Sequence, residues 1–142
     1  MKTMKHFLFA SLALVLLLSS VGVTPANAQG LSGKFVLPFV AHWGSATLPA
    51  GDYQFKMERL NGIVYVDNGR KIVGMILPET AGTSYATASS LVVTESGGVK
   101  SVRELRMAPA GIVLHFPAAR LANHRVQISE ARYLIQILPT GE

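Results

Sequence analysis

Residues 29–142 are predicted to form a single all-β domain, an antiparallel β-sandwich or a small closed barrel of about eight strands. Short segments rich in β-branched and aromatic residues follow one another along this part of the chain. Gly, Pro and Asn separate the segments at short intervals, and no long helical period competes with them. A chain of this length can bury a hydrophobic core without disulfide bonds.

The first 28 residues have the three parts of a secretory signal peptide. Lys2 and Lys5 give the positive start, residues 7–18 form an apolar run without a charge, and Ala-Asn-Ala at 26–28 supplies the small residues of a cleavage site. The run is shorter than the roughly 20 residues that span a bilayer. We therefore expect removal of residues 1–28 and export to the periplasm or the extracellular space, with no transmembrane helix in the mature protein.

Composition excludes several classes of function. The 142 residues include no cysteine, so a disulfide framework, a thiol nucleophile and a cysteine zinc site are all excluded. The 13 Lys and Arg residues against 8 Asp and Glu give a net charge of +5, but the basic residues are spread along the chain. Because no basic run with interleaved aromatic residues is present, a nucleic-acid partner is not expected.

The first strand is expected over residues 34–42, with Pro38 at a sheet edge or a bulge because proline cannot donate a ladder hydrogen bond. Pro49 and Gly51 then predict a turn, since proline sets φ at the second position and glycine fits the fourth. Over residues 52–60 apolar side chains alternate with polar ones, which predicts a strand with one face in water.

Asn61-Gly62 and Asn68-Gly69 predict two-residue hairpin turns, because a type I′ turn needs positive φ at both central positions. Together they imply an antiparallel meander of three strands. The expected strands are residues 52–60, 63–67 and 70–77.

Counting through these two turns sets Leu60 opposite Ile63 and Tyr65 opposite Ile72, all four on one face. Both faces of the meander then mix apolar and charged residues. Either a bulge shifts the register, or another element or a partner covers this apolar face. We favour the bulge, because hairpin loops with a bulge are common.

The second half of the chain continues the β pattern. Residues 80–88 are expected to form a loop or an irregular strand, and residues 91–107 a hairpin around Gly97-Gly98. The pairs expected across this hairpin are Glu95 with Lys100 and Val93 with Val102.

Pro109 and Gly111 repeat the Pro-Ala-Gly turn before another alternating strand at 112–116. The segments that follow are a short helical or irregular turn at 117–123 and strand segments at 125–129 and 133–138.

The LPAGDYQF sequence at 48–55, which follows a Phe-rich first strand and a Trp-Gly pair, resembles a group of small uncharacterised secreted bacterial β proteins. It is also similar to the turn-to-strand element of carboxypeptidase-regulatory and transthyretin-like β-sandwich modules. The resemblance covers residues 35–55. It implies a β-sandwich and implies no functional residue, because the shared motif is a turn.

No catalytic or metal-binding motif stands out. His42, His115 and His124 lack the spacing of a metal site, and no serine lies in a GxSxG or SxxK motif. We therefore predict neither a cofactor nor an enzyme, although the paired carboxylates of a glycosidase can come from separate strands and leave no spacing to detect.

The aromatic and apolar residues are the better binding candidates. Trp43 and His42 lie at the end of the first strand, and Tyr65 and Tyr85 have polar neighbours, so an exposed ring could stack on a sugar or anchor a protein. A single Trp in a β-sandwich is more often part of the core, which we favour for Trp43. The face of Leu60, Ile63, Tyr65 and Ile72 could hold a protein partner or a second copy.

These observations predict an exported, non-enzymatic module with a binding or structural role. A carbohydrate-binding module is the first alternative, and exposed, coplanar aromatic rings on one sheet would favour it. A small secreted hydrolase is the second, and it would require a cleft where histidine and acidic side chains converge.

Signal cleavage after residue 28 is the first testable prediction. Intact-mass analysis of exported protein should show an N-terminus at Gln29 or its cyclised form, because small residues precede that bond. Exported material that still carries Met1 would contradict the prediction.

Overall fold

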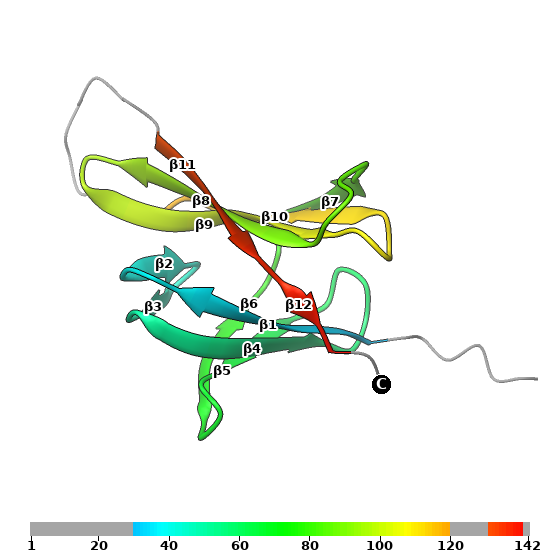
Figure 1. Ribbon diagram of the computed structural model, residues 1–142, viewed down its shortest axis with the longest axis horizontal. Coiled ribbons are helices and arrows are strands. Elements are labelled where there is room, and N and C mark those ends of the chain that lie inside the picture. Colours follow the sequence, from blue (N-terminus) through cyan, green and yellow to red (C-terminus); the bar gives the residue numbers. More distant parts are fainter. Residues whose placement is uncertain (1–29, 120–130, 141–142) are drawn as a thin grey trace, which may run out of the picture.

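Two β-sheets pack face to face in the part of the chain that the computed structural model describes, residues 30–119 and 131–140 (Figure 1). These residues contain twelve strands and no helix, and the sheets do not close into a barrel. The predicted β-sandwich is therefore confirmed, with more strands than the expected eight or so. The predicted signal peptide, the strand at 125–129 and residues 120–123 lie outside the described residues.

The smaller sheet has five antiparallel strands. In spatial order they are β12 (Leu138–Pro139), β1 (Leu31–Leu37), β4 (Gly51–Met57), β5 (Val64–Asp67) and β6 (Ile72–Ile76). β1 pairs with β4 along its whole length, from Leu31 opposite Met57 to Leu37 opposite Gly51. Directly opposed residues share a face, so one face of this sheet enters the core and the other is free.

The larger sheet has seven strands. Five of them follow the order β11 (Ala131–Gln136), β8 (Ser90–Ser96), β9 (Val99–Met107), β10 (Ile112–His115) and β7 (Thr80–Thr83). The other two are β2 (Ala41–Trp43) and β3 (Ala46–Leu48), which pair with each other. β2 also pairs in parallel with β9, with His42 opposite Ser101.

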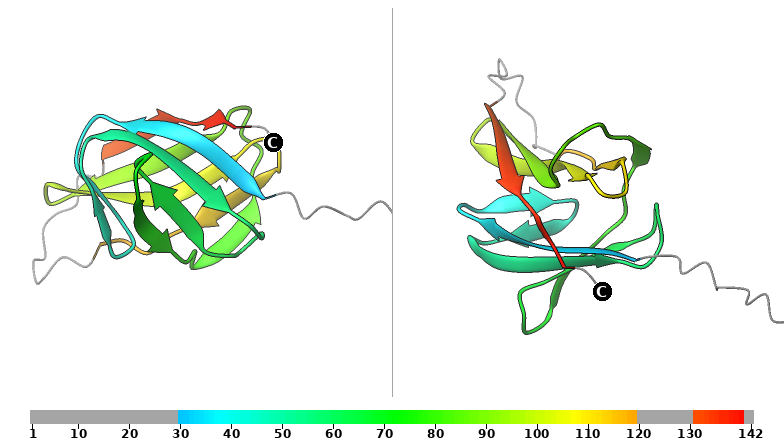
Figure 2. Two further views of the ribbon diagram at one scale, coloured as in Figure 1. Left: turned by 90° about the horizontal axis from the view of Figure 1, so that it is seen from below. Right: turned by 45° about the vertical axis from the view of Figure 1, so that its right-hand side comes forward.

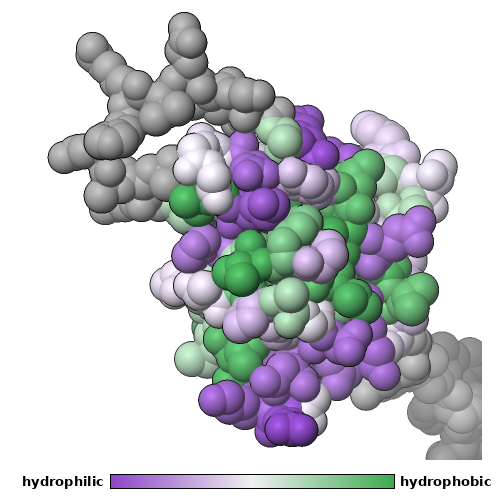
Figure 3. Space-filling view, turned by 60° about the vertical axis from the view of Figure 1, so that its left-hand side comes forward, coloured by the Kyte–Doolittle hydropathy of each residue, from purple (hydrophilic) through white to green (hydrophobic). Residues whose placement is uncertain are grey.

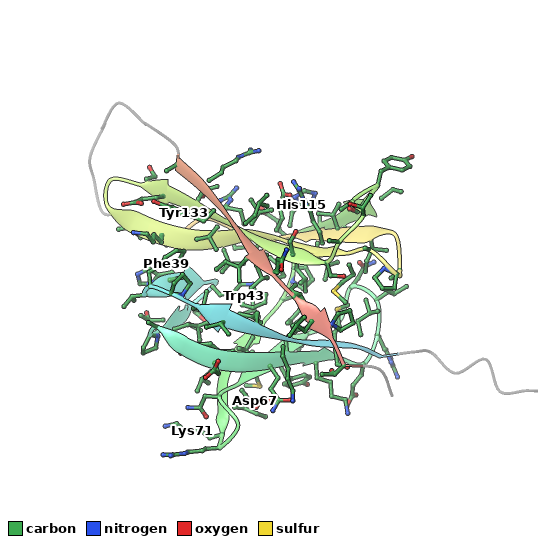
Figure 4. All side chains as sticks on the ribbon, viewed as in Figure 1. Phe39, Trp43, Asp67, Lys71, His115 and Tyr133 are labelled. Carbon is green, nitrogen blue, oxygen red and sulfur yellow. The ribbon has the colours of Figure 1, made fainter. Side chains whose placement is uncertain are left out.

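The core lies between the sheets and is centred on Trp43, whose side chain is 0% exposed (Figure 4). Its indole ring makes edge-to-face contacts with Phe35 and Phe116, with ring centres 5.9 and 5.3 Å apart. Such pairs add to the free energy of burial. The core position of Trp43 is confirmed, and the alternation that predicted Tyr53 and Phe55 as core residues holds as well.

Pro38 ends the first strand, so the prediction of one strand over residues 34–42 is wrong. The chain bends at residues 38–39 and continues as β2, which belongs to the other sheet. Proline lacks the N–H that would extend the ladder, and its place between two strands lets the chain leave one sheet for the other.

The turn predicted at Asn61-Gly62 is also wrong. Only Asn61 has a positive φ, 64°, and the Gly62 N–H donates to the Arg59 carbonyl at 2.9 Å. β4 ends at Met57, and the connection to β5 covers residues 58–63. A type I′ turn needs two residues with positive φ, so this sequence forms a longer loop instead of a two-residue one.

At Asn68-Gly69 the loop has four residues, 68–71, and only Gly69 has a positive φ, 81°. The Asn68 Oδ1 accepts hydrogen bonds from the backbone N–H groups of Arg70 and Lys71, both at 3.1 Å. A four-residue loop, held by hydrogen bonds to the Asn68 side chain, therefore forms in place of the expected two-residue turn.

The favoured bulge is confirmed, because the register of β5 and β6 shifts between Val66 and Asp67. Tyr65 therefore lies opposite Met75, and Ile72 lies opposite Asp67. The predicted pairing of Tyr65 with Ile72 is therefore wrong. The predicted pairing of Leu60 with Ile63 is also wrong, because these two residues lie in the loop before β5.

Two other predicted turns are confirmed. Gly97 and Gly98 have φ of 57° and 80° and form a two-residue turn, and the pairs Glu95–Lys100 and Val93–Val102 are present. At Pro109 the turn closes with a hydrogen bond of 3.1 Å from the Gly111 N–H to the Ala108 carbonyl.

The C-terminal strands join the two sheets (Figure 2). β11 pairs with β8 in the larger sheet over six residues, and β12 pairs with β1 in the smaller sheet. Between them Ile137 is buried, and its N–H donates to the Ser89 carbonyl at 3.0 Å. One side of the sandwich is therefore held together by a single continuous segment.

We expect any side chain at position 51 to lower the stability of the fold. Gly51 has a φ of 157°, a conformation almost confined to glycine, and the Tyr53 hydroxyl fixes the preceding turn with a hydrogen bond of 2.7 Å to the Pro49 carbonyl. Gly51→Ala should lower the free energy of unfolding by about 1–3 kcal/mol, measured by urea denaturation.

Gly82→Ala is the matched control. Gly82 lies in the exposed strand β7, and an added Cβ would make only an ordinary contact with the Val113 side chain at 3.4 Å. The free energy of unfolding of this variant should stay within about 0.5 kcal/mol of that of the original protein. Equal effects of the two changes would show that the backbone at Gly51 is unstrained.

Candidate functional site

A groove of about 710 Å³ lies on the outer side of the five-stranded sheet. Three exposed apolar side chains contribute to its walls: Val36, Leu134 and Leu138, which are 59%, 68% and 69% exposed. Polar side chains from β1 and β4 lie between them. These polar residues are Lys34, Asp52 and Gln54, with Asn68 and Gln136 at the sides.

The departure of the C-terminal segment from β1 creates this groove. β12 pairs with β1 at only two positions, Gly33 and Lys34, whereas β1 itself continues to Leu37. Past Lys34 the segment turns toward the other sheet, so that β1 and β11 separate (Figure 1). The edge of β1 that faces away from β4 therefore has no ladder partner at residues 35–37 among the described residues, and Phe35 and Val36 line the groove.

The opposite wall is the tip of the β5–β6 hairpin, which projects from the five-stranded sheet at the bottom of Figure 1. Asn68 and Gly69 line the groove, and Lys71 lies at the tip (Figure 4). The tip has a fixed shape, because the Asp67 carboxylate accepts the Gly69 N–H at 2.9 Å and the Asn68 side chain holds the rest of the loop.

A cluster of four side chains fixes β11, which forms the first wall. The Tyr133 hydroxyl donates to Glu95 at 2.7 Å, and the Lys100 ammonium lies 3.2 Å from the same carboxylate oxygen. Lys100 also lies over the rings of Phe39 and Tyr133, 5.2 and 5.7 Å from their centres, and the two rings meet edge to face. Cation–π and aromatic contacts both favour this arrangement.

The same cluster shifts two pKa values in opposite directions. The hydrogen bond from Tyr133, followed by that from Lys100, lowers the pKa of Glu95 below its ordinary value of 4.5. In return, the bond to Glu95 raises the pKa of Tyr133 above 10.0. The network is therefore complete only while Glu95 is ionised and Tyr133 is protonated.

The outer face of the seven-stranded sheet carries a second polar group of residues. Glu104 on β9 pairs with Arg106, with an oxygen–nitrogen distance of 2.7 Å, and His115 lies across the strand with its Nδ1 4.0 Å from the carboxylate. His115 faces away from the core (Figure 4) and its side chain is 44% exposed. This is the histidine–acid pair that the hydrolase alternative required, and it lines two hollows of the outer sheet face.

The structure separates the predicted binding residues. Trp43 is buried, and His42 beside it forms a hydrogen bond of 3.1 Å with Thr47. Tyr65 lies on the outer face of the five-stranded sheet, and Tyr85 lies beside the other sheet with 93% of its surface exposed. The coplanar aromatic surface that would favour a carbohydrate-binding module is therefore not formed by these three rings.

Part of the predicted apolar face is present in altered form. Tyr65 and Ile72 lie on the outer face of β5 and β6, where Met75 joins them opposite Tyr65. Leu60 and Ile63 are exposed but belong to the loop before β5.

Sequence reasoning missed the residues that form the groove. The alternation of Leu134, Gln136 and Leu138 within the predicted strand at 133–138 was a usable signal, because it places two apolar side chains on the same side. Because the chain passes from one sheet to the other at Ile137, the sequence does not show that this side of the strand is exposed. Nothing local to Val36 indicates that it lies beside them.

No protein-family model, curated protein or solved structure matches this chain. The resemblance of residues 48–55 to transthyretin-like modules stays a prediction. Within residues 30–119 and 131–140, no helix has the length and apolar character needed to cross a membrane. The same residues contain no group of three or more side chains arranged to hold a metal ion.

Tyr133→Phe tests the cluster that fixes β11. The lowered pKa of Glu95 means that its contribution to stability is present above pH 4.5 and is lost as the pH falls through its folded pKa. The raised pKa of Tyr133 means that its contribution is present below pH 10.0 and is lost above that. We expect a lower Tm than the original protein at neutral pH and a smaller difference below pH 4.5, measured by circular dichroism.

Tyr65→Phe serves as the control, because no hydrogen bond to the Tyr65 hydroxyl is present within the described part of the chain. It should leave the Tm unchanged at both pH values. If Tyr133→Phe lowers the Tm equally at acid and neutral pH, the hydroxyl acts through packing and the ionic network is unimportant.

Proposed function

We propose that this chain is an exported, non-enzymatic β-sandwich module that binds a protein partner in the groove of the five-stranded sheet. It would act in the periplasm or at the cell surface, as the predicted signal peptide indicates. The observation that supports it most is the gathering of Val36, Leu134 and Leu138 around a groove of about 710 Å³. Apolar side chains exposed together, rather than singly, are typical of interaction sites.

The groove favours an extended segment of a partner protein. Its volume lies in the range of about 300–1,000 Å³ that is usual for binding pockets. The open edge of β1 offers backbone groups to a segment in β conformation, and the alternation of apolar and polar lining matches the alternating side chains of a strand. Lys34 and Asp52 supply charges of both signs for orientation.

Apolar surface extends beyond the groove. Tyr65, Ile72 and Met75 lie on the same outer face, on the strands that carry the hairpin tip. Figure 3 views the two sheets from one side of the sandwich, where apolar surface gathers in the middle and hydrophilic surface borders it above and below. A protein partner larger than one segment could cover more of this surface, and so could a second copy of the chain.

The experiment selects peptides of eight to ten residues from a displayed random library on purified exported protein, and then measures their affinity by fluorescence anisotropy. We expect selected peptides to alternate apolar and polar residues. Leu134→Asp and Leu138→Asp should each weaken binding by about tenfold or more, because a charge then enters the apolar contact. Both residues are exposed, so the fold should be unaffected.

Met75→Asp is the matched control, since Met75 is 64% exposed on the same outer face but does not line the groove. It should leave peptide affinity unchanged. Loss of binding with Met75→Asp alone would move the partner surface to β5 and β6. Turnover of a chromogenic ester or glycoside that disappears with His115→Ala would replace the binding module by the hydrolase alternative.

A further inference from the structure

The outer face of the seven-stranded sheet has a cationic cluster built around a β-bulge. The register of β8 and β9 shifts so that Val92 lies opposite Glu104 and Val93 opposite Val102, which leaves Arg103 as the extra residue. Val102 and Leu105 both enter the core, and Arg103 and Glu104 between them both point outward. Bulges re-aim side chains in this way and are frequent beside functional sites.

The charge of this cluster is positive. Arg103, Arg106 and Arg132 bring three guanidinium groups, and Glu104 is the one carboxylate among the described residues that line the cluster. The Glu104 Oε2 is already held by the Arg106 Nε and Nη2, at 2.9 and 2.7 Å. Three positive groups and one negative group leave a net charge of +2, which favours an anionic ligand.

A small hollow of about 130 Å³ lies within the cluster. Arg103 and Arg132 line it from two different strands, with the Thr94 hydroxyl and His115, and Val92 is buried at its base. Its size and its donors match a single oxyanion group such as a carboxylate or a sulfate. Guanidinium groups bind such groups with paired hydrogen bonds.

A second hollow of about 450 Å³ adjoins the first, because both are lined by Glu104 and His115. It contains Tyr85, whose ring is 93% exposed, together with Ser84 and Arg106. An exposed ring beside polar groups that accept and donate hydrogen bonds is suited to a sugar, which has an apolar face and a rim of hydroxyls.

We infer that this face binds an acidic saccharide. Its carboxylate or sulfate group lies between Arg103 and Arg132, and the sugar ring lies against Tyr85 with hydroxyls facing Glu104 and Arg106. The site lies on the outer face of the seven-stranded sheet, where Arg132 and the groove residue Leu134 project from the same side of β11, and it does not depend on the proposed protein partner. It also differs from an aromatic platform, because one ring and an anion pocket replace several coplanar rings.

The test measures binding of a heparin-derived hexasaccharide to the exported protein by calorimetry, at about 150 mM salt so that long-range attraction is screened. Arg103→Gln and Arg132→Gln should each weaken binding by about tenfold or more, since each removes a charge-assisted hydrogen bond. Tyr85→Ala should weaken binding of the hexasaccharide but leave binding of inorganic sulfate unchanged. Cellohexaose, which is neutral, should bind far more weakly.

Arg70→Gln is the matched control, because it removes the same charge from the hairpin tip on the other side of the molecule. Equal weakening by Arg70→Gln and Arg103→Gln would overturn the site and leave only non-specific attraction. Competition by single-stranded DNA of the same charge, as effective as the hexasaccharide itself, would overturn the saccharide class. Unchanged peptide affinity in the Arg103 and Arg132 variants would show that the groove and this site are separate.

Discussion

The passage of the C-terminal segment from one sheet to the other is the constraint on which the rest of the structure depends. The side chain of Ile137 enters the core where Gly33 has no side chain, and a Cβ there would lie only 2.5 Å from it. The Ile137 N–H donates to the carbonyl of Ser89, just before β8 of the larger sheet, so the crossing residue leaves no buried backbone donor unpaired. One side of the sandwich is thereby closed, and β1 is freed from its neighbour after Lys34. The groove is the direct consequence of that separation.

The two outer faces of the sandwich are chemically different. The inner faces of both sheets are committed to the core around Trp43, so any recognition has to use the outer faces or the edges. The groove offers exposed aliphatic side chains and an open strand edge, whereas the outer face of the larger sheet offers arginines beside an exposed tyrosine. A module with these two surfaces could bind a protein partner and an acidic polymer at the same time. A ligand could bind to either surface without a rearrangement of the core.

The parts of the fold that were predictable from sequence are those decided locally. The alternation of Tyr53, Phe55 and Met57 places them in the core, and Gly97-Gly98 supplies the two positive φ values of a tight hairpin. The two-residue turn predicted at Asn61-Gly62 is absent, because an Asn-Gly pair allows a type I′ turn without requiring it. The groove was not predictable, since it joins residues about 100 positions apart, and their proximity follows from how the sheets pack. The sequence identified Tyr85 as a binding candidate, but it did not identify Arg106, which lines the same hollow.

Breaks in the alternation of a strand carry information that the alternation itself does not. In β9 two consecutive charged residues, Arg103 and Glu104, point outward between the core residues Val102 and Leu105. Period two forbids this pattern in a regular strand, so it marks the bulge between β8 and β9. The bulge costs ladder regularity in the middle of the larger sheet, where an unbroken strand would pair more completely. Its compensation is that two adjacent side chains reach the same outer face, and this is the arrangement on which the cationic cluster depends.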